Sequence, residues 1–295
     1  MPTKIIRKCC ICGKPVISHG PSAKYCPTCA VFAQRLDYKQ LPTETVEMIW
    51  NYVRQYGYVC YYTGMPLNMT NPHDPFYCVL DHWNPHDNRK LVLTSSLLND
   101  MKTDLTEAEF WYIIRQLANF KRHHTMFRKK KLLYWDRDYE RLYIDESPLL
   151  GGTKICSRIC SVCGKRILHS ANPTKYCRIC ARYIAHMQSL QVPSKTIKEV
   201  CAGIHKNGYR CGYTGVWLDV NNSRSPWYCV LDHRVPGDSS KLVPTFALLN
   251  EMKSDLTEKE FWYYILQFAD YKEKNEKVRK KKITHWFRLY PVEDV

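Results

Sequence analysis

The pattern of apolar and polar residues predicts an amphipathic helix that begins at Pro42-Thr43. Its apolar positions recur at the steps of a single helix face: Val46, Ile49, Trp50 and Val53. Gly57 follows the last of these positions, and a glycine is a common helix stop because it tolerates a left-handed backbone. A second helix of the same kind is expected between Pro193-Ser194 and Gly208.

A β-rich run follows the first of these helices. Residues 76–80, Phe-Tyr-Cys-Val-Leu, read as a short strand that leads into the dipeptide Asp81-His82. A proline-bearing loop then passes to a second apolar run at 90–93, Lys-Leu-Val-Leu. The pattern therefore predicts two strands joined by a loop, with Asp81-His82 at the end of the first strand.

Helix-capping residues come next. Residues 94–96, Thr-Ser-Ser, can cap a helix that carries Asn99 and Lys102. The pattern Thr-x-x-Glu at 106–109, and again at 257–260, is a capping box in front of a helix that opens with Phe-Trp-Tyr. These aromatic helices are expected to supply core residues.

The whole pattern occurs twice, with the copies offset by 151 positions. The segments Tyr77–His82 and Leu97–Asn99 each have an identical counterpart at that distance. Such a period is much longer than that of a solenoid repeat, so it indicates duplicated domains. We predict two domains of the α+β class, residues 1–147 and 154–295, joined by a linker at 148–153.

The composition directs attention to polyanionic partners. The chain has 44 Lys and Arg against 28 Asp and Glu, which gives a formal charge of +16. An excess of this size attracts nucleic acid first and an anionic membrane second. With 45% hydrophobic residues the 295-residue chain is expected to fold.

The sequence also bears on the cellular compartment. No apolar run approaches the roughly 18 residues needed to cross a bilayer, and the first residues lack the apolar core of a secretory signal. Fifteen cysteines without such a signal are expected to be thiols and metal ligands. We therefore expect a reducing compartment, either the cytoplasm or an organelle or nucleoid, and a protein that is not secreted.

Each copy contains two Cys-x-x-Cys knuckles separated by thirteen residues. Two such knuckles can enclose one tetrahedral zinc ion, whereas redox-active Cys-x-x-Cys motifs do not come in paired quartets with this spacing. We predict two structural Zn²⁺ ions per chain. Their ligands are Cys9, Cys12, Cys26 and Cys29 in the first copy and Cys160, Cys163, Cys177 and Cys180 in the second.

A strand, Asp-His, a loop, a second strand and a helix bearing asparagine resemble, in that order, the HNH endonuclease family, the ββα-metal nucleases. The neighbouring motifs match as well: Cys-x-x-Thr-Gly at 60–64, Leu-Asp-His-x-x-Pro at 80–85, and Asn-x-x-Lys at 99–102. The resemblance covers about forty to fifty residues of each copy. It implies two tandem copies of a four-cysteine zinc-binding module followed by a ββα-metal core with flanking helices.

The resemblance implies a role for each residue type of the motif. The histidine would take a proton from the attacking water, the aspartate and asparagine would hold one Mg²⁺ or Mn²⁺ per site, and the lysine would contact a phosphate. In that order the residues are His82, Asp81 with Asn99, and Lys102 in the first copy, and His233, Asp232 with Asn250, and Lys253 in the second.

Two features of the motif are structurally demanding. Asp81 and His82 are adjacent, so on a regular strand they face opposite ways, and the strand end must bend if both are to converge. The family commonly has an asparagine just before the second strand, and this chain has Lys90 and Lys241 there.

Two basic clusters follow the aromatic helices, and aromatic residues flank both. The functional interpretation is a set of phosphate contacts, and the alternative is a solvated helix face. The residues predicted to bind nucleic acid are Arg128, Lys129, Lys130, Lys131, Arg279, Lys280, Lys281 and Lys282.

The sequence thus predicts a metal-dependent, site-specific endonuclease of the homing, phage or restriction type. A single chain would act as a monomeric pseudo-dimer on double-stranded DNA, and each repeat would cut one strand. The alternatives are an inactive zinc-containing protein that binds DNA or RNA, and a basic scaffold in a ribonucleoprotein. Two unequal copies suit an asymmetric target.

Overall fold

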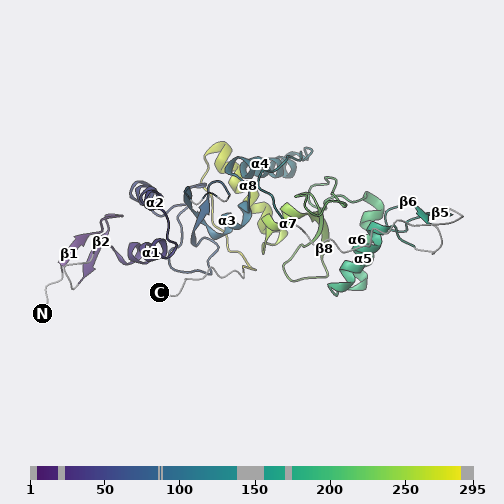
Figure 1. Cartoon of the computed structure of the whole chain (residues 1–295), viewed down its shortest axis with the longest axis horizontal. Coiled ribbons are helices and arrows are strands. Elements are labelled where there is room, and N and C mark those ends of the chain that lie inside the picture. Colours follow the sequence, from purple (N-terminus) through teal and green to yellow (C-terminus); the bar gives the residue numbers. More distant parts are fainter. Residues whose placement is uncertain are drawn as a thin grey trace. The chain divides into compact units, whose positions relative to one another are not determined.

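The computed structural model describes residues 5–18, 24–85, 87, 89–137, 156–169 and 175–286. The described residues form an α+β fold with eight helices and eight strands, and the strands pair into four two-stranded antiparallel sheets (Figure 1). The linker predicted at 148–153 lies outside the described residues.

Each copy begins with a hairpin and a helix that carry the cysteine quartet. The first knuckle of each quartet follows the first hairpin strand, and its turn contains Gly13 or Gly164, both with φ of +70°. The elements are β1 (Ile5–Lys8), β2 (Pro15–Ser18) and α1 (Pro27–Tyr38) in the first copy, and β5 (Cys156–Ile159), β6 (Arg166–His169) and α5 (Arg178–Ser189) in the second.

The predicted amphipathic helices are present as α2 (Thr43–Tyr56) and α6 (Ser194–Asn207). Both end at the predicted glycine, since the backbone N–H of Gly57 donates to the carbonyl of Val53 at 2.9 Å and Gly208 does the same at its own helix. Both glycines have positive φ, which is why a glycine suits this position.

A strand–strand–helix module follows in each copy. In the first copy, β3 and β4 pair so that Asp81 lies opposite Val92 and His82 opposite Leu91. The hydroxyl of Ser95 caps the helix by accepting the N–H of Leu98 at 3.2 Å. The elements are β3 (Cys78–His82), β4 (Leu91–Ser95) and α3 (Ser96–Lys102), then β7 (Cys229–His233), β8 (Leu242–Phe246) and α7 (Ala247–Lys253).

The last helices, α4 (Glu107–His123) and α8 (Glu258–Lys274), begin at the predicted capping boxes. The carboxylate of Glu109 accepts the backbone N–H of Thr106 at 3.0 Å and its hydroxyl at 2.8 Å. Thr257 and Glu260 repeat these contacts in the second copy. Core side chains follow on both helices: Phe110, Trp111, Ile113 and Ile114 on α4, and Phe261, Trp262, Tyr264 and Ile265 on α8.

The chain folds into two compact units whose boundaries differ from those of the sequence repeats. The first unit contains residues 1–115 and 263–295, and the second contains residues 116–262. The end of α4, with the segment after it, therefore belongs to the unit built on the second repeat. The end of α8 belongs in the same way to the unit built on the first.

Aromatic packing within each unit explains this division. In the second unit the buried ring of Phe127 packs against Trp227 at 5.7 Å and against Phe246 at 5.5 Å. In the first unit the ring of Tyr264 packs 6.2 Å from Phe76. The two repeats thus exchange the ends of their last helices. We call residues 124–137 and 275–286, which follow these helices, the exchanged tails.

Candidate functional site

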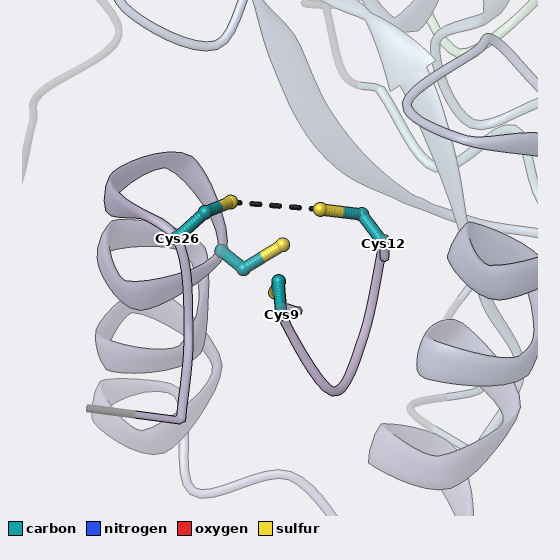
Figure 2. A group of neighbouring side chains, drawn as sticks. Cys9, Cys12 and Cys26 are labelled. Carbon is teal, nitrogen blue, oxygen red and sulfur yellow. Dashed lines mark hydrogen bonds between the residues drawn. The ribbon is translucent and has the colours of Figure 1, made fainter. Parts of the chain in front are cut away.

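The four cysteines of the first quartet converge on one point (Figure 2). Their sulfur atoms all lie within 4.8 Å of one another, and the Sγ atoms of Cys12 and Cys26 are 3.5 Å apart. Four thiolates around a tetrahedral ion with Zn–S bonds of about 2.3 Å have sulfurs about 3.8 Å apart. The quartet therefore has the dimensions of a closed zinc site, in agreement with the sequence prediction.

Backbone hydrogen bonds support the thiolate charge at Cys9, whereas burial raises the pKa of the Cys12 and Cys29 thiols. Burial raises the pKa of the Cys9 thiol, but hydrogen bonds from the backbone of Cys12, Cys26 and Ile11 lower it to about 6. The hydroxyl of Tyr58 donates to the Sγ of Cys29 at 3.2 Å. Such outer contacts orient the ligands of structural metal sites.

The second quartet has the same arrangement. The Sγ atoms of Cys163 and Cys177 lie 3.6 Å apart, and Tyr209 donates to Cys180 at 3.2 Å. The backbone N–H of Cys177 donates to the Sγ of Cys160. Among the described residues, the two quartets are the sets of three or more Cys, His, Asp or Glu whose ligand atoms converge.

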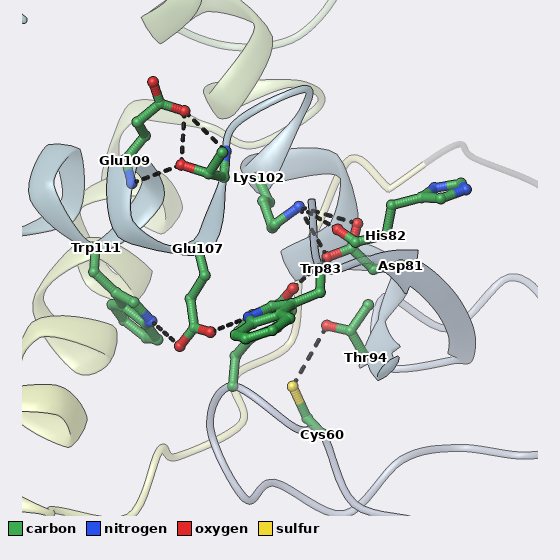
Figure 3. A network of polar contacts seen from close by, with 11 residues as sticks. Cys60, Asp81, His82, Trp83, Thr94, Lys102, Glu107, Glu109 and Trp111 are labelled. Carbon is green, nitrogen blue, oxygen red and sulfur yellow. Dashed lines mark hydrogen bonds and ion pairs between the residues drawn. The ribbon is translucent and has the colours of Figure 1, made fainter. Parts of the chain in front are cut away.

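A buried ion pair forms the centre of the strand–strand–helix module (Figure 3). The ammonium of Lys102 lies 3.1 Å from a carboxylate oxygen of Asp81 and donates to the carbonyl of His82 at 2.8 Å. The hydroxyl of Tyr62 donates to Asp81 at 2.7 Å. Lys102 is only 1% exposed and Asp81 5%, so this contact is shielded from solvent. Burial raises the pKa of Asp81, although Lys102 and Tyr62 act to lower it.

The second copy reproduces this cluster residue for residue. Lys253 lies 3.2 Å from Asp232 and donates to the carbonyl of His233 at 2.7 Å, and Tyr213 donates to the same carboxylate. Burial lowers the pKa of Lys253, whereas Asp232 acts to raise it. Each of the two diverged copies thus has its own Tyr–Asp–Lys cluster with the same contacts.

The positions of the two lysines differ from the prediction that they contact a phosphate. Lys102 and Lys253 are both buried, and each donates to its own aspartate and to a strand carbonyl. The physical reason is that a carboxylate on the inner face of a strand needs a nearby cation when it is removed from water. In this arrangement the lysines hold the fold of the module.

The aspartate and histidine lie on opposite sides of their strand. Both Asp81 and His82 belong to β3 and stay paired with β4, so the alternation of a regular strand applies to them. Figure 3 shows the imidazole of His82 directed away from the Asp81–Lys102 pair. His82 is partly exposed, as is His233, whose Nε2 lies 3.4 Å from the hydroxyl of Ser239.

The donor chemistry of this cluster suits a divalent ion, but its charge is already balanced. Asp81 and the half-buried Asn99 offer the oxygen ligands that Mg²⁺ and Mn²⁺ prefer. The ammonium group of Lys102, however, already lies beside the Asp81 carboxylate and balances its charge. An ion on this carboxylate therefore has to displace the ammonium, and the same holds for Asp232, Asn250 and Lys253.

The exchanged tails present the predicted basic residues to solvent. All of them are exposed: Arg128, Lys129, Lys130, Lys131, Arg279, Lys280, Lys281 and Lys282. Glutamine side chains fix the start of each tail, since the N–H of Arg128 donates to Gln116 at 3.1 Å and that of Arg279 to Gln267 at 3.0 Å. The clusters therefore have a defined backbone position.

Sequence reasoning missed the tyrosine of the cluster. Tyr62 and Tyr213 occupy the same place in the two copies, inside the Cys-x-x-Thr-Gly motif, and each donates to the strand aspartate. The available signal was the identity of the two copies at this position. The sequence pattern gave no indication that the two distant segments meet.

Comparison with family models, with curated proteins and with solved structures finds no match to this chain. None of the helices in the described ranges combines the length and the apolar character needed to span a bilayer.

Proposed function

We propose that the chain is a metal-dependent nuclease of the HNH type that acts on double-stranded DNA, with one catalytic centre in each unit. The observation that carries this proposal is the strand–strand–helix module. In both copies Asp-His ends the first strand and the asparagine lies on the helix after the second. This is the element order that the resemblance implies.

The residues of each module would divide the work. His82 and His233, partly exposed at the strand ends, would accept the proton of the attacking water, because a neutral imidazole has a nitrogen that can act as a general base. A divalent ion held by Asp81 and Asn99, or by Asp232 and Asn250, would neutralise charge on the phosphodiester.

The exposed exchanged tails support nucleic acid as the partner. Each tail presents four consecutive basic residues, 128–131 and 279–282, on a backbone fixed by a glutamine. Contacts of this kind fix a protein on a phosphate backbone without reading sequence. Two units in one chain would allow a monomer to address both strands.

A second candidate function is binding without cleavage, to DNA or to folded RNA. The observation that favours it is that the carboxylate of Asp81 is buried, forms an ion pair with Lys102 and accepts a hydrogen bond from Tyr62. If this ion pair never opens, Asp81 cannot hold a metal ion, and the module is a structural support for the basic tails.

Cleavage of supercoiled plasmid in Mg²⁺ or Mn²⁺ decides between the two. We expect the wild-type chain to produce linear DNA, whereas His82→Ala and His233→Ala each produce open circles because one strand is still cut. The double variant is expected to bind without cutting. Wild-type protein that binds duplex but leaves the plasmid intact would establish the second candidate and refute the first.

A matched control separates loss of chemistry from loss of folding. His73 is an exposed histidine that lies outside both strand–strand–helix modules and outside the exchanged tails, so His73→Ala should cut like the wild type. If either single variant at His82 or His233 still linearises plasmid at the wild-type rate, the assignment of two histidine-dependent centres is wrong. Analytical ultracentrifugation checks the expected monomer.

A further inference from the structure

The second unit contains a cavity of about 950 Å³ that opens between α6 and β8. It is lined by the exposed glycines Gly203 and Gly212, by Trp217, and by Phe120 from the end of α4. Its volume lies within the range of small-molecule sites, which are usually about 300–1,000 Å³.

The first unit has a cluster of three tyrosines in the corresponding region. The ring of Tyr52 lies 5.0 Å from that of Tyr56 and 6.1 Å from that of Tyr61. In the second repeat the residues at these three positions are Gly203, Asn207 and Gly212, and all three line the cavity. The second copy therefore lacks three aromatic side chains at positions that line its cavity.

The same comparison shows that positive charge has replaced neutral residues around the cavity. The two copies differ at four positions of the cavity lining. The second copy has Lys206, Arg210, Trp217 and Arg234 there, and the first copy has, in the same order, Gln55, Val59, Pro66 and Trp83. The second copy thus lacks the three tyrosine side chains and has three cationic side chains and one tryptophan around the cavity. An unused void would not need them.

The tryptophan and one arginine form a flat platform at this site. The guanidinium carbon of Arg210 lies 3.9 Å from the ring centre of Trp217, and Arg210 also donates to the carbonyl of Gly215 at 2.8 Å. Trp217 remains 54% exposed, an unusual state for the largest apolar side chain. Arg234 pairs with Glu258, and Glu199 is the acid on the lining, so the charge of the wall remains positive.

We propose that this cavity binds a nucleotide, that is, an aromatic base together with its phosphate. Tryptophan and arginine planes stack on bases whatever their sequence, and lysine and arginine bind phosphate. The nucleotide is either free or an unpaired residue of a nucleic-acid strand. The second source rests on the nucleic-acid binding proposed above and would give the second unit a contact that the first unit lacks.

Two glycines that line the cavity differ in how much room they leave for a substituted side chain. A Cβ on Gly212 would lie 2.0 Å from a methyl carbon of Val243, so substitution there disturbs the strand. A Cβ on Gly203 meets nothing within 4 Å, and the first copy carries a tyrosine at the same helix position. Gly203→Tyr therefore places in the cavity the side chain that the first copy carries at this position.

The test uses the full chain and two probes. The first is adenosine monophosphate, titrated by calorimetry, and the second is a labelled duplex with one extra unpaired adenosine, compared with the fully paired duplex. Gly203→Tyr is expected to weaken binding of the cavity's ligand by at least about tenfold, and Trp217→Ala similarly. Gly203→Ala, which adds a methyl group without filling the cavity, should stay within about twofold of the wild type. Zinc content and thermal unfolding confirm that each variant is folded.

The outcomes separate this proposal from the proposed function. A loss of AMP binding in Gly203→Tyr supports a site for free nucleotide, and a loss of the preference for the extra-nucleotide duplex supports a site for a strand. The proposal is overturned if AMP and the extra-nucleotide duplex both bind the wild type and Gly203→Tyr equally, or if neither probe binds the cavity. Failure of the paired duplex to bind wild-type protein contradicts the proposed function, while a Gly203-dependent AMP titration leaves the cavity site standing.

Discussion

Replacing Lys102 by methionine tests whether the Tyr–Asp–Lys cluster holds the fold. The change keeps most of the buried side-chain volume and removes the ammonium that lies 3.1 Å from Asp81 and 2.8 Å from the carbonyl of His82. Asp81 is 5% exposed, so its carboxylate is left without a cation and without water. Breaking one partner of such a buried pair costs about 3–5 kcal/mol.

The expected loss is large enough to measure as a melting temperature. For a unit of about 150 residues, 1 kcal/mol corresponds to about 2–4 °C, so Lys102→Met should melt roughly 6–20 °C below the wild type. Lys39 is exposed, and Lys39→Met should stay within about 0.5 kcal/mol of the wild type. Asp81→Asn in the Lys102→Met background should recover much of the loss, because it removes the stranded charge.

The pH dependence of the variant follows from the raised pKa of Asp81. Burial makes the folded state hold this proton more tightly than the unfolded state, so stability falls as the pH rises through the folded pKa. The cost of Lys102→Met should therefore be largest at neutral pH and smaller in acid, where Asp81 becomes protonated. Circular dichroism melts at several pH values measure this. A variant as stable as the wild type at neutral pH would refute a structural role for the pair.

Three further outcomes are expected. Gently purified protein should contain two zinc ions by elemental analysis, and Cys29→Ser should leave one, because the structural sites require all four thiolates. Phe127→Ala should cost the second unit about 3–5 kcal/mol, and faster amide exchange in residues 226–253 measures this loss. The exposed neighbour Met126 should tolerate alanine. An effect confined to the first repeat would contradict the exchange of helix ends. Neutralising residues 129–131 should weaken binding to all duplex sequences alike and reduce the salt-dependence slope by roughly 2–3, as measured by titrations from low to high salt, and an unchanged slope would exclude these lysines from the interface.

The sequence predicted the local elements because their signals are local. The cap at Ser95, the glycine stop at Gly57 and the capping box at Thr106 each act within a few residues, and the structure has all three. Spacing alone also predicted the cysteine quartets, since one knuckle on a tight turn and one at the start of a helix leave little freedom in where the thiols point.

The remaining features depend on contacts between distant residues. Nothing in the pattern around Lys102 indicates burial, because a lysine at a helix end is usually solvated, and only the pairing with Asp81 from another element accounts for it. The exchange of helix ends was equally hidden, since Phe127 reads as an aromatic residue in a basic tail until Trp227 and Phe246 are beside it.

The exchange of helix ends makes the two repeats depend on each other for folding and in evolution. Because residues 263–295 complete the first unit and residues 116–262 form the second, neither repeat carries all the parts of one unit in a continuous stretch. A protease cut between the repeats would leave two fragments that still need each other's helix ends, and these should copurify as one particle. Mutations in a tail act on the opposite core, which ties the two copies to a shared evolutionary fate even as their surfaces diverge.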